Sequence, residues 1–165
     1  MNGGLVFSAN LVFEDNPGVA VGYAVGVNSF LESTGPTTII PQTMLAVPSA
    51  CTAGQFTVTV LGATGTSTAA AYLGATTDPT GNSNEGGALS CDITANNGAP
   101  VSCSSPSSIG LPAGAYVNFV VESFTHPSDF SGARAFMSFI CEDPATPSRA
   151  GRATSKSPTR TSLIP

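Results

Sequence analysis

The four cysteines are the residues of this sequence whose types and spacing point most directly to a reaction, the formation of disulfide bonds. Cys91 and Cys103 lie at equal distances on either side of Asn97, in an Asn-Asn-Gly step that tolerates the positive φ angles of a tight turn. If the chain reverses there, antiparallel pairing puts Cys91 opposite Cys103 and Ile93 opposite Val101, at a Cα separation that suits a disulfide. We therefore predict a Cys91–Cys103 bridge within a β-hairpin, the alternative being two buried free thiols.

The other two cysteines are then paired by elimination. Cys51 begins one strand-like segment (CTAGQFTVTVL) and Cys141 ends another (ARAFMSFIC), so a bridge between them ties an early strand to the last one. Such a crosslink is worth about 2 to 5 kcal/mol in a small domain. Zinc ligation is disfavoured, because there is no close Cys-x-x-Cys pair and His126 is the only histidine. Two disulfides imply an oxidising location outside the cytoplasm.

A hydrolase is the catalytic alternative, because His126 and Asp129 lie close together in SFTHPSDF and serines are plentiful. A Ser-His-Asp site needs an exposed nucleophile, usually on a strained elbow, and the sequence has no G-x-S-x-G motif. The adjacent acids at 14–15 and 142–143 would face opposite ways on strands, so neither pair forms an acid/base couple. We therefore predict that the protein is not an enzyme.

A polar loop at 78–85 (DPTGNSNE) gathers carboxylate and amide oxygens without bases, as a Ca²⁺ site requires. Its candidate ligands are Asp78, Asn82, Asn84 and Glu85. Their spacing departs from that of an EF-hand, so we favour a solvated loop and predict no metal or other cofactor, with Ca²⁺ as the alternative. For sugar stacking the chain offers no Trp, and only Tyr72 and Tyr116 stand on strand faces opposite the expected core.

Charge is divided unevenly along the chain. Residues 1–143 hold ten acids and one base, Arg134, for a net charge of −9, whereas residues 144–165 hold four bases and no acid. The last segment is also rich in Pro, Ser and Thr, so we predict one folded domain over 1–143 and a disordered basic tail over 144–165. We interpret the tail as inert or as a cloning or reading-frame scar, and predict no nucleic-acid partner.

The elements that position these residues are expected to be short β-strands, because Gly, Pro, Ser, Thr and Ala abound and charged residues are only 9% of the chain. Apolar alternation predicts strands near 5–13, 19–27, 37–47, 51–61, 69–75, 90–95, 99–103, 116–123 and 134–141. About eight or nine short strands indicate an all-β fold, an antiparallel β-sandwich of the jelly-roll type. No apolar run reaches the length of a membrane span, so we predict no membrane insertion.

Two of these strands have unusual faces. The strand at 134–141 has apolar residues on both faces, so we expect it to be central and covered on both sides. The strand at 19–27 has one face that is almost bare of side chains, which lets another backbone approach closely. This bare face consists of Ala20, Gly22, Ala24 and Gly26. It serves either tight packing inside the domain or a contact between copies.

The order of segments CTAGQFTVTV, ALSCDI, a short turn with VSC, LPAGAYVNFVV and ARAFMSFIC resembles small jelly-roll modules of bacterial surface proteins and phage structural proteins. These modules are similar in plan to the heads of the C1q and tumour necrosis factor superfamily. The resemblance covers about residues 37–142. It implies a non-catalytic head that is often trimeric and that serves display or receptor binding.

The sequence therefore predicts a structural or receptor-binding head located outside the cell, on a cell surface or on a virion. No signal-peptide pattern follows Met1, so we expect either a fragment of a longer exported protein or a virion component. The expected partners are further copies of the chain in a homotrimer, and a surface receptor or glycan. The alternative function is a carbohydrate-binding adhesion module, in which Ca²⁺ could assist.

Overall fold

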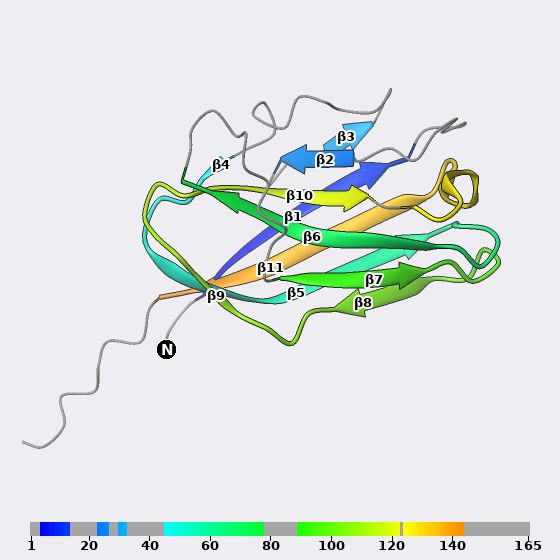
Figure 1. Cartoon of the computed structure of the whole chain (residues 1–165). Helices are drawn as coiled ribbons and strands as arrows, with labels where there is room; N and C mark the ends of the chain where they lie inside the picture. Colours follow the sequence, from blue (N-terminus) through cyan, green and yellow to red (C-terminus); the bar gives the residue numbers. More distant parts are fainter. Residues whose placement is uncertain are drawn as a thin grey trace, which may run out of the picture.

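The structure is a computed structural model that describes residues 4–13, 23–26, 30–32, 45–77, 89–122 and 124–143. In these residues the chain forms eleven β-strands and one short 3-10 helix, η2 (Pro127–Phe130). The strands make two sheets that lie one above the other (Figure 1). The described part of the chain contains no helix that is long and apolar enough to cross a membrane.

Sheet A has the strand order β3-β1-β11-β5-β8, and β9 also pairs with β5. Its strands are β1 (Leu5–Val12), β3 (Phe30–Glu32), β5 (Cys51–Leu61), β8 (Val101–Ser104), β9 (Ile109–Leu111) and β11 (Arg134–Glu142). Sheet B has the order β2-β10-β6-β7, and β4 also pairs with β10. Its strands are β2 (Tyr23–Gly26), β4 (Leu45–Ala46), β6 (Thr68–Thr76), β7 (Ser90–Thr94) and β10 (Tyr116–Glu122).

Every neighbouring pair is antiparallel except β1 and β3, which are parallel. The all-β class and the two antiparallel sheets agree with the prediction. The described residues contain more strands than the eight or nine expected, because β3 and β9, of three residues each, match no predicted strand. Alternation cannot be recognised in so short a segment.

The core lies between the two sheets and is built from the inward residues of both. Aromatic rings connect the layers: Phe56 of β5 and Phe139 of β11 both lie near Phe119 of β10, with ring centroids 6.3 and 5.8 Å apart. A second aromatic group, Phe13, Phe124 and Phe130, closes one end of the sandwich. These contacts hold the sheets in a fixed register, since each aromatic pair adds about 0.5 to 1.5 kcal/mol beyond its buried area.

Strand β5 changes face part-way along its length. Cys51 and Ala53 are buried at its start, but Phe56, Val58 and Val60 are buried further on. The switch from odd to even positions requires one extra residue, and the β5–β11 register shifts where Ser138 pairs with Thr57 but Ile140 pairs with Gly54. Gln55 at this bulge has a positive φ of 52°.

The chain reverses where the sequence predicts, at Asn97 and Gly98, which have φ angles of 48° and 87°. The Ala99 N–H donates to the Asn96 carbonyl at 2.9 Å and closes the turn. The predicted hairpin register is nevertheless wrong. Strand β7, with Ile93, pairs with β6 in sheet B, whereas β8, with Val101, pairs with β5 in sheet A.

The reason for this difference is a set of backbone hydrogen bonds that hold the turn away from its own flanking strands. Ala95, Asn97 and Gly98 donate to the carbonyls of Ser67, Gly65 and Ala63, at 2.8, 2.9 and 2.7 Å. The turn therefore pairs with the β5–β6 connection, and the chain passes from one sheet to the other as an arch.

The two disulfides have the pairing predicted from the sequence, Cys51 with Cys141 and Cys91 with Cys103. Cys51 and Cys141 lie on the neighbouring strands β5 and β11 of sheet A, with Cα atoms 5.5 Å apart. Cys91 and Cys103 lie on the edge strands β7 and β8, 5.8 Å apart at Cα, and so link sheet B to sheet A. One bridge thus crosslinks a sheet, and the other crosslinks the sandwich.

Parts of the predicted organisation lie outside the described residues. Ala20, Gly22 and the tail at 144–165 are among them. The remaining positions of the bare face fall in β2, where Ala24 is in register with Val120 of β10 and Gly26 with Asn118. Strand β2 is thus the terminal strand of the sheet B order.

Candidate functional site

The outward side of sheet A is the broadest candidate surface among the described residues. We call it the A face and define it by outward positions of β1, β11, β5 and β8: Ser8, Asn10, Val12, Arg134, Phe136, Ser138, Thr57, Thr59, Leu61, Ser102 and Ser104. Most of these side chains are hydroxyls or amides, and Arg134 is charged; Glu142, at the end of β11, adds a carboxylate on the same side of the sheet. A polar surface of this kind favours hydrogen bonding to a partner.

Hydroxyl groups on the A face are paired across the strands. The Thr59 and Ser102 oxygens lie 2.8 Å apart, and so do those of Thr57 and Ser138. A hydroxyl has one donor and two acceptor positions, so each pair keeps capacity for a further partner. The hydrogen bond within each pair holds both side chains, and so fixes the direction in which each hydroxyl can bond to a further partner.

Phe136 stands in the middle of this polar surface. Its side chain is 41% exposed, whereas every other phenylalanine whose burial the structure describes is buried. The expectation that β11 is covered on both sides is therefore wrong. The strand is central in sheet A, but its outward face is open to solvent.

The surroundings of Phe136 follow from the strand register. Asn10 of β1 lies opposite it on one side, and Thr59 of β5 lies opposite it on the other. Arg134 precedes Phe136 by two residues, and therefore lies on the same face. A shallow hollow of about 210 Å³ runs between β1 and β11 beside these residues and is lined in part by Asn10, Val12, Arg134 and Phe136.

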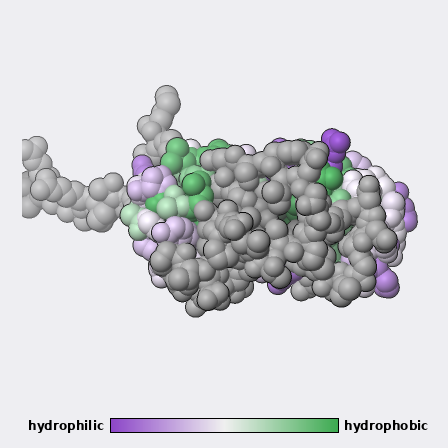
Figure 2. All heavy atoms as spheres, turned by 90° about the horizontal axis from the view of Figure 1, so that it is seen from above, coloured by the Kyte–Doolittle hydropathy of each residue, from purple (hydrophilic) through white to green (hydrophobic). Residues whose placement is uncertain are grey.

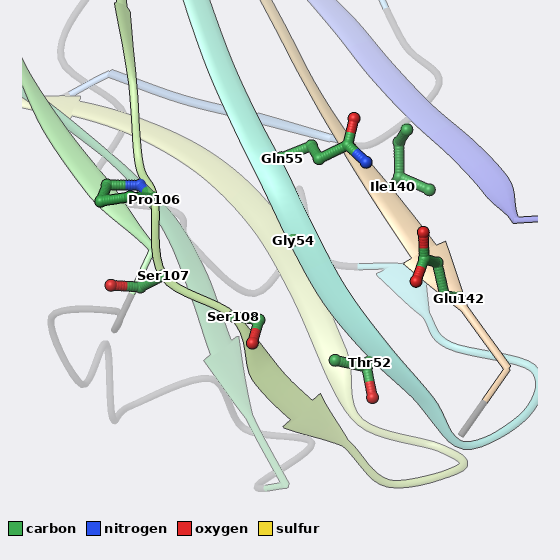
Figure 3. A pocket seen from close by; sticks show the side chains of 8 residues that line it. All are labelled: Thr52, Gly54, Gln55, Pro106, Ser107, Ser108, Ile140 and Glu142. Atoms are coloured by element: carbon green, nitrogen blue, oxygen red, sulfur yellow. The ribbon is translucent and has the colours of Figure 1, made fainter. Parts of the chain in front are cut away.

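A second hollow of about 260 Å³ lies near the β5 bulge, between β11 and the loop at 105–108 (Figure 3). The bulge directs the Gln55 amide toward Ile140, and Glu142 stands further along β11 (Figure 3). Hydroxyls of Thr52 and Ser108 complete the polar lining. The hollow offers one carboxylate, so it lacks the two carboxyl groups that a glycosidase-type acid/base pair needs.

Hydrophobic residues also reach the surface away from the A face. Viewed from above, hydrophobic surface appears at the end of the sandwich that carries β4 and β9, beside hydrophilic residues (Figure 2). Leu45 of β4 is exposed there. A third hollow of about 230 Å³ at this end is lined by the end of β6 and by residues 109–112. Its lining contains backbone, hydroxyls and apolar groups but no ionisable side chain.

His126 and Asp129 have contacts that stabilise loops. The Asp129 carboxylate accepts the Ser67 N–H at 3.3 Å, and the Ser67 hydroxyl donates to the backbone carbonyl of His126. Gly65 lies against this carboxylate, and a Cβ atom there would overlap it. A hydrolytic triad instead requires the imidazole to lie between nucleophile and acid, and these contacts do not assemble one.

The two tyrosines considered for sugar stacking differ in their accessibility. Tyr72 lies on the outward side of sheet B, but it is only 7% exposed and packs with Val120. Burial, followed by the charge of Glu122 and a hydrogen bond to it, raises the pKa of Tyr72 to about 12. Tyr72 is therefore too enclosed to stack on a sugar, and Tyr116 is half-buried.

The predicted calcium ligands at 78–85 lie outside the described residues. Within the described ranges, no group of three His, Cys, Asp or Glu side chains could hold a metal ion.

Phe136 was not identified as a site residue from the sequence. Its strand (RAFMSFICE) has apolar residues at both odd and even positions, a pattern that also fits a strand covered on both sides. The available signal was the residue composition on either side of it: the outward positions of β5 and β8 are Thr and Ser. Residues in register share a face of the sheet, so Thr and Ser beside Phe136 indicate a face open to solvent.

Comparison with known proteins does not assign a family. No protein-family model matches the chain, and no curated protein matches it with statistical significance. Function must then be argued from the surface and not from the fold, because one β-sandwich architecture serves many functions.

Proposed function

We propose that residues 1–143 form a non-catalytic head domain that works outside the cytoplasm, on a cell surface or a virion, and binds a surface receptor. The observation that carries this proposal is the A face, an open sheet surface of paired hydroxyls around one exposed aromatic ring. The two disulfides support an oxidising location. A carbohydrate-binding adhesion module is the second candidate, because hydroxyls, an amide and an aromatic ring are the groups that bind sugars.

The order of the strands supports a jelly-roll arrangement. The chain crosses between sheets from β5 to β6, from β7 to β8, from β9 to β10 and from β10 to β11. Its first strand, β1, pairs with its last, β11. Repeated crossing with the terminal strands side by side is expected when a long hairpin is wrapped into two sheets.

The proposal includes a symmetric homotrimer, with the strand that contains Ala24 and Gly26 near the axis. The folded part has a net charge of −9, so copies repel one another, and only apolar contact would hold them together. Salt at about 0.15 M confines the repulsion to about 8 Å. Light scattering at that salt concentration should give the mass of three chains, and a monomer mass at all concentrations would refute the trimer.

Receptor binding is tested by one pair of matched variants. Ser102→Glu adds bulk and charge to the A face, and Ser90→Glu makes the same change at an exposed position of β7 in sheet B. Binding of the labelled domain to a glycan array and to intact cells should fall roughly tenfold or more for Ser102→Glu, because the paired hydroxyl is lost and a charge is buried at the contact. Ser90→Glu should bind like the unmodified domain. Equal binding by both variants, or no binding by the unmodified domain, would contradict the proposal.

A further inference from the structure

The single basic residue of residues 1–143 lies beside the one phenylalanine that is exposed among those whose burial the structure describes. Arg134 is the only Lys or Arg in residues 1–143, against ten acids. It is exposed on the A face, two residues before Phe136 on the same strand. Among the residues whose side chains the structure describes, no carboxylate forms an ion pair with it. An exposed guanidinium beside an exposed aromatic ring offers a ligand a charged contact and an apolar contact on the same face.

The strand register fixes what surrounds this cation. Val12 of β1 and Leu61 of β5 are in register with Arg134 on either side. Their apolar side chains give the arginine stem a surface to lie on, while the guanidinium remains in water. The neighbouring row along β11 holds Asn10, Phe136 and then the Thr59–Ser102 hydroxyl pair. Rows of the same face are about 7 Å apart, which is within the length of a sugar ring and its substituents.

We propose that this part of the A face binds a carboxylate-bearing sugar, such as a uronic or sialic acid unit of a glycan. The Phe136 ring packs against the apolar face of the pyranose. Asn10, Thr59 and Ser102 hydrogen-bond its hydroxyls. The Arg134 guanidinium binds the carboxylate through two parallel hydrogen bonds, for which its planar geometry is suited.

Charge favours an acidic sugar over a neutral one. A neutral sugar offers the guanidinium only hydroxyl acceptors, whereas a carboxylate pairs with its charge through two parallel hydrogen bonds. The overall negative charge of the domain repels an anionic ligand at long range. Recognition then depends on the local contact with Arg134, which makes the affinity sensitive to this one side chain. The inference rests on the binding role proposed above and names the ligand class.

The experiment uses the full chain and defined probes: tetragalacturonate for uronic acids, sialyllactose for sialic acids, and lactose as the neutral control. Isothermal titration should detect binding of one or both acidic probes and little or none of lactose. Arg134→Gln should weaken binding about tenfold or more, and Arg134→Lys should recover only part of it, because lysine lacks the planar pair of donors. Phe136→Ser should weaken the binding of the same probe.

Arg152→Gln is the matched control, because it removes the same charge from the tail segment. It should leave affinity unchanged, and circular dichroism should show that all variants are folded. Equal binding of lactose and the acidic probes, an unaffected Arg134→Gln, or a loss caused by Arg152→Gln would each overturn the inference. Binding to cells that survives removal of their glycans would also overturn it and would indicate a protein partner. If these results exclude an acidic sugar but Ser102→Glu still abolishes binding to the glycan array or to cells, the proposed receptor-binding function stands and only the ligand class is wrong.

Discussion

The outward sides of the two sheets differ in solvent exposure, although their central strands share an apolar pattern. On β10 of sheet B, the outward Val120 is only 3% exposed, and Asn118 is fully buried. On β11 of sheet A, the outward Phe136 is 41% exposed. Both strands carry apolar residues at odd and even positions. The outward side of sheet B is thus buried along β10, although β7 at its edge is exposed, whereas the A face is open to solvent along its central strand.

The largest expected effect concerns the crosslink within sheet A. The Cys51–Cys141 bridge spans 90 residues of sequence, and the Cys91–Cys103 bridge spans 12. Loop-closure entropy predicts that replacing both cysteines by Ala lowers the free energy of unfolding by about 4 to 5 kcal/mol for the first pair and about 3 for the second. Urea unfolding of the two double variants measures the difference. A larger loss from the 91–103 pair would show that the inter-sheet bridge also supports packing.

A matched pair of substitutions compares the two outward sides directly. Val120→Asp places a charge at a buried outward position of sheet B, and Phe136→Asp places one at an exposed position of sheet A. The first should lower the free energy of unfolding by about 3 kcal/mol or more, because a charge without a partner is expensive to bury. The second should cost about 1 kcal/mol or less. Similar losses in chemical denaturation would contradict the difference between the sides.

The smallest effect is a pH dependence on the sheet B side. The pKa of Tyr72 is raised from 10 to about 12, so folding favours the protonated phenol. This contribution to stability is complete below about pH 10 and is lost as the pH rises toward 12. Tyr72→Phe should therefore show a smaller decrease in melting temperature over this pH range. Tyrosinate absorbance at alkaline pH should confirm that one tyrosine titrates late, and simultaneous titration of all three would contradict the assignment.

The sequence predicted features that depend on local chemistry. The turn at Asn97–Gly98 follows from residues that tolerate positive φ, and the cysteine pairing follows from their spacing around it. The hairpin register failed because the partner of each flanking strand is decided by distant residues, such as Ser67 and Gly65, which accept hydrogen bonds from the turn. Local spacing cannot distinguish a hairpin from an arch, since both reverse the chain.

The candidate site was less predictable for a similar reason. Phe136 and Val120 each lie on the outward face of a strand whose inward face is also apolar. The apolar pattern does not show which of these two outward faces is buried. That depends on where other segments pack. The β5 bulge, by contrast, was predictable, because buried residues switch from Ala53 to Phe56 and one strand can keep both inside only with an extra residue.

The bridge between β7 and β8 determines where the sandwich can open. These strands are the neighbouring edges of the two sheets, and a covalent bond prevents their separation. Transient opening is therefore restricted to the opposite margin, where β2 and β3 end their sheets. Exchange of an edge strand between copies requires that strand to leave its own sheet, which a bond to the other sheet opposes. The same bond that closes one margin thus lowers the tendency of the domain to exchange strands between copies.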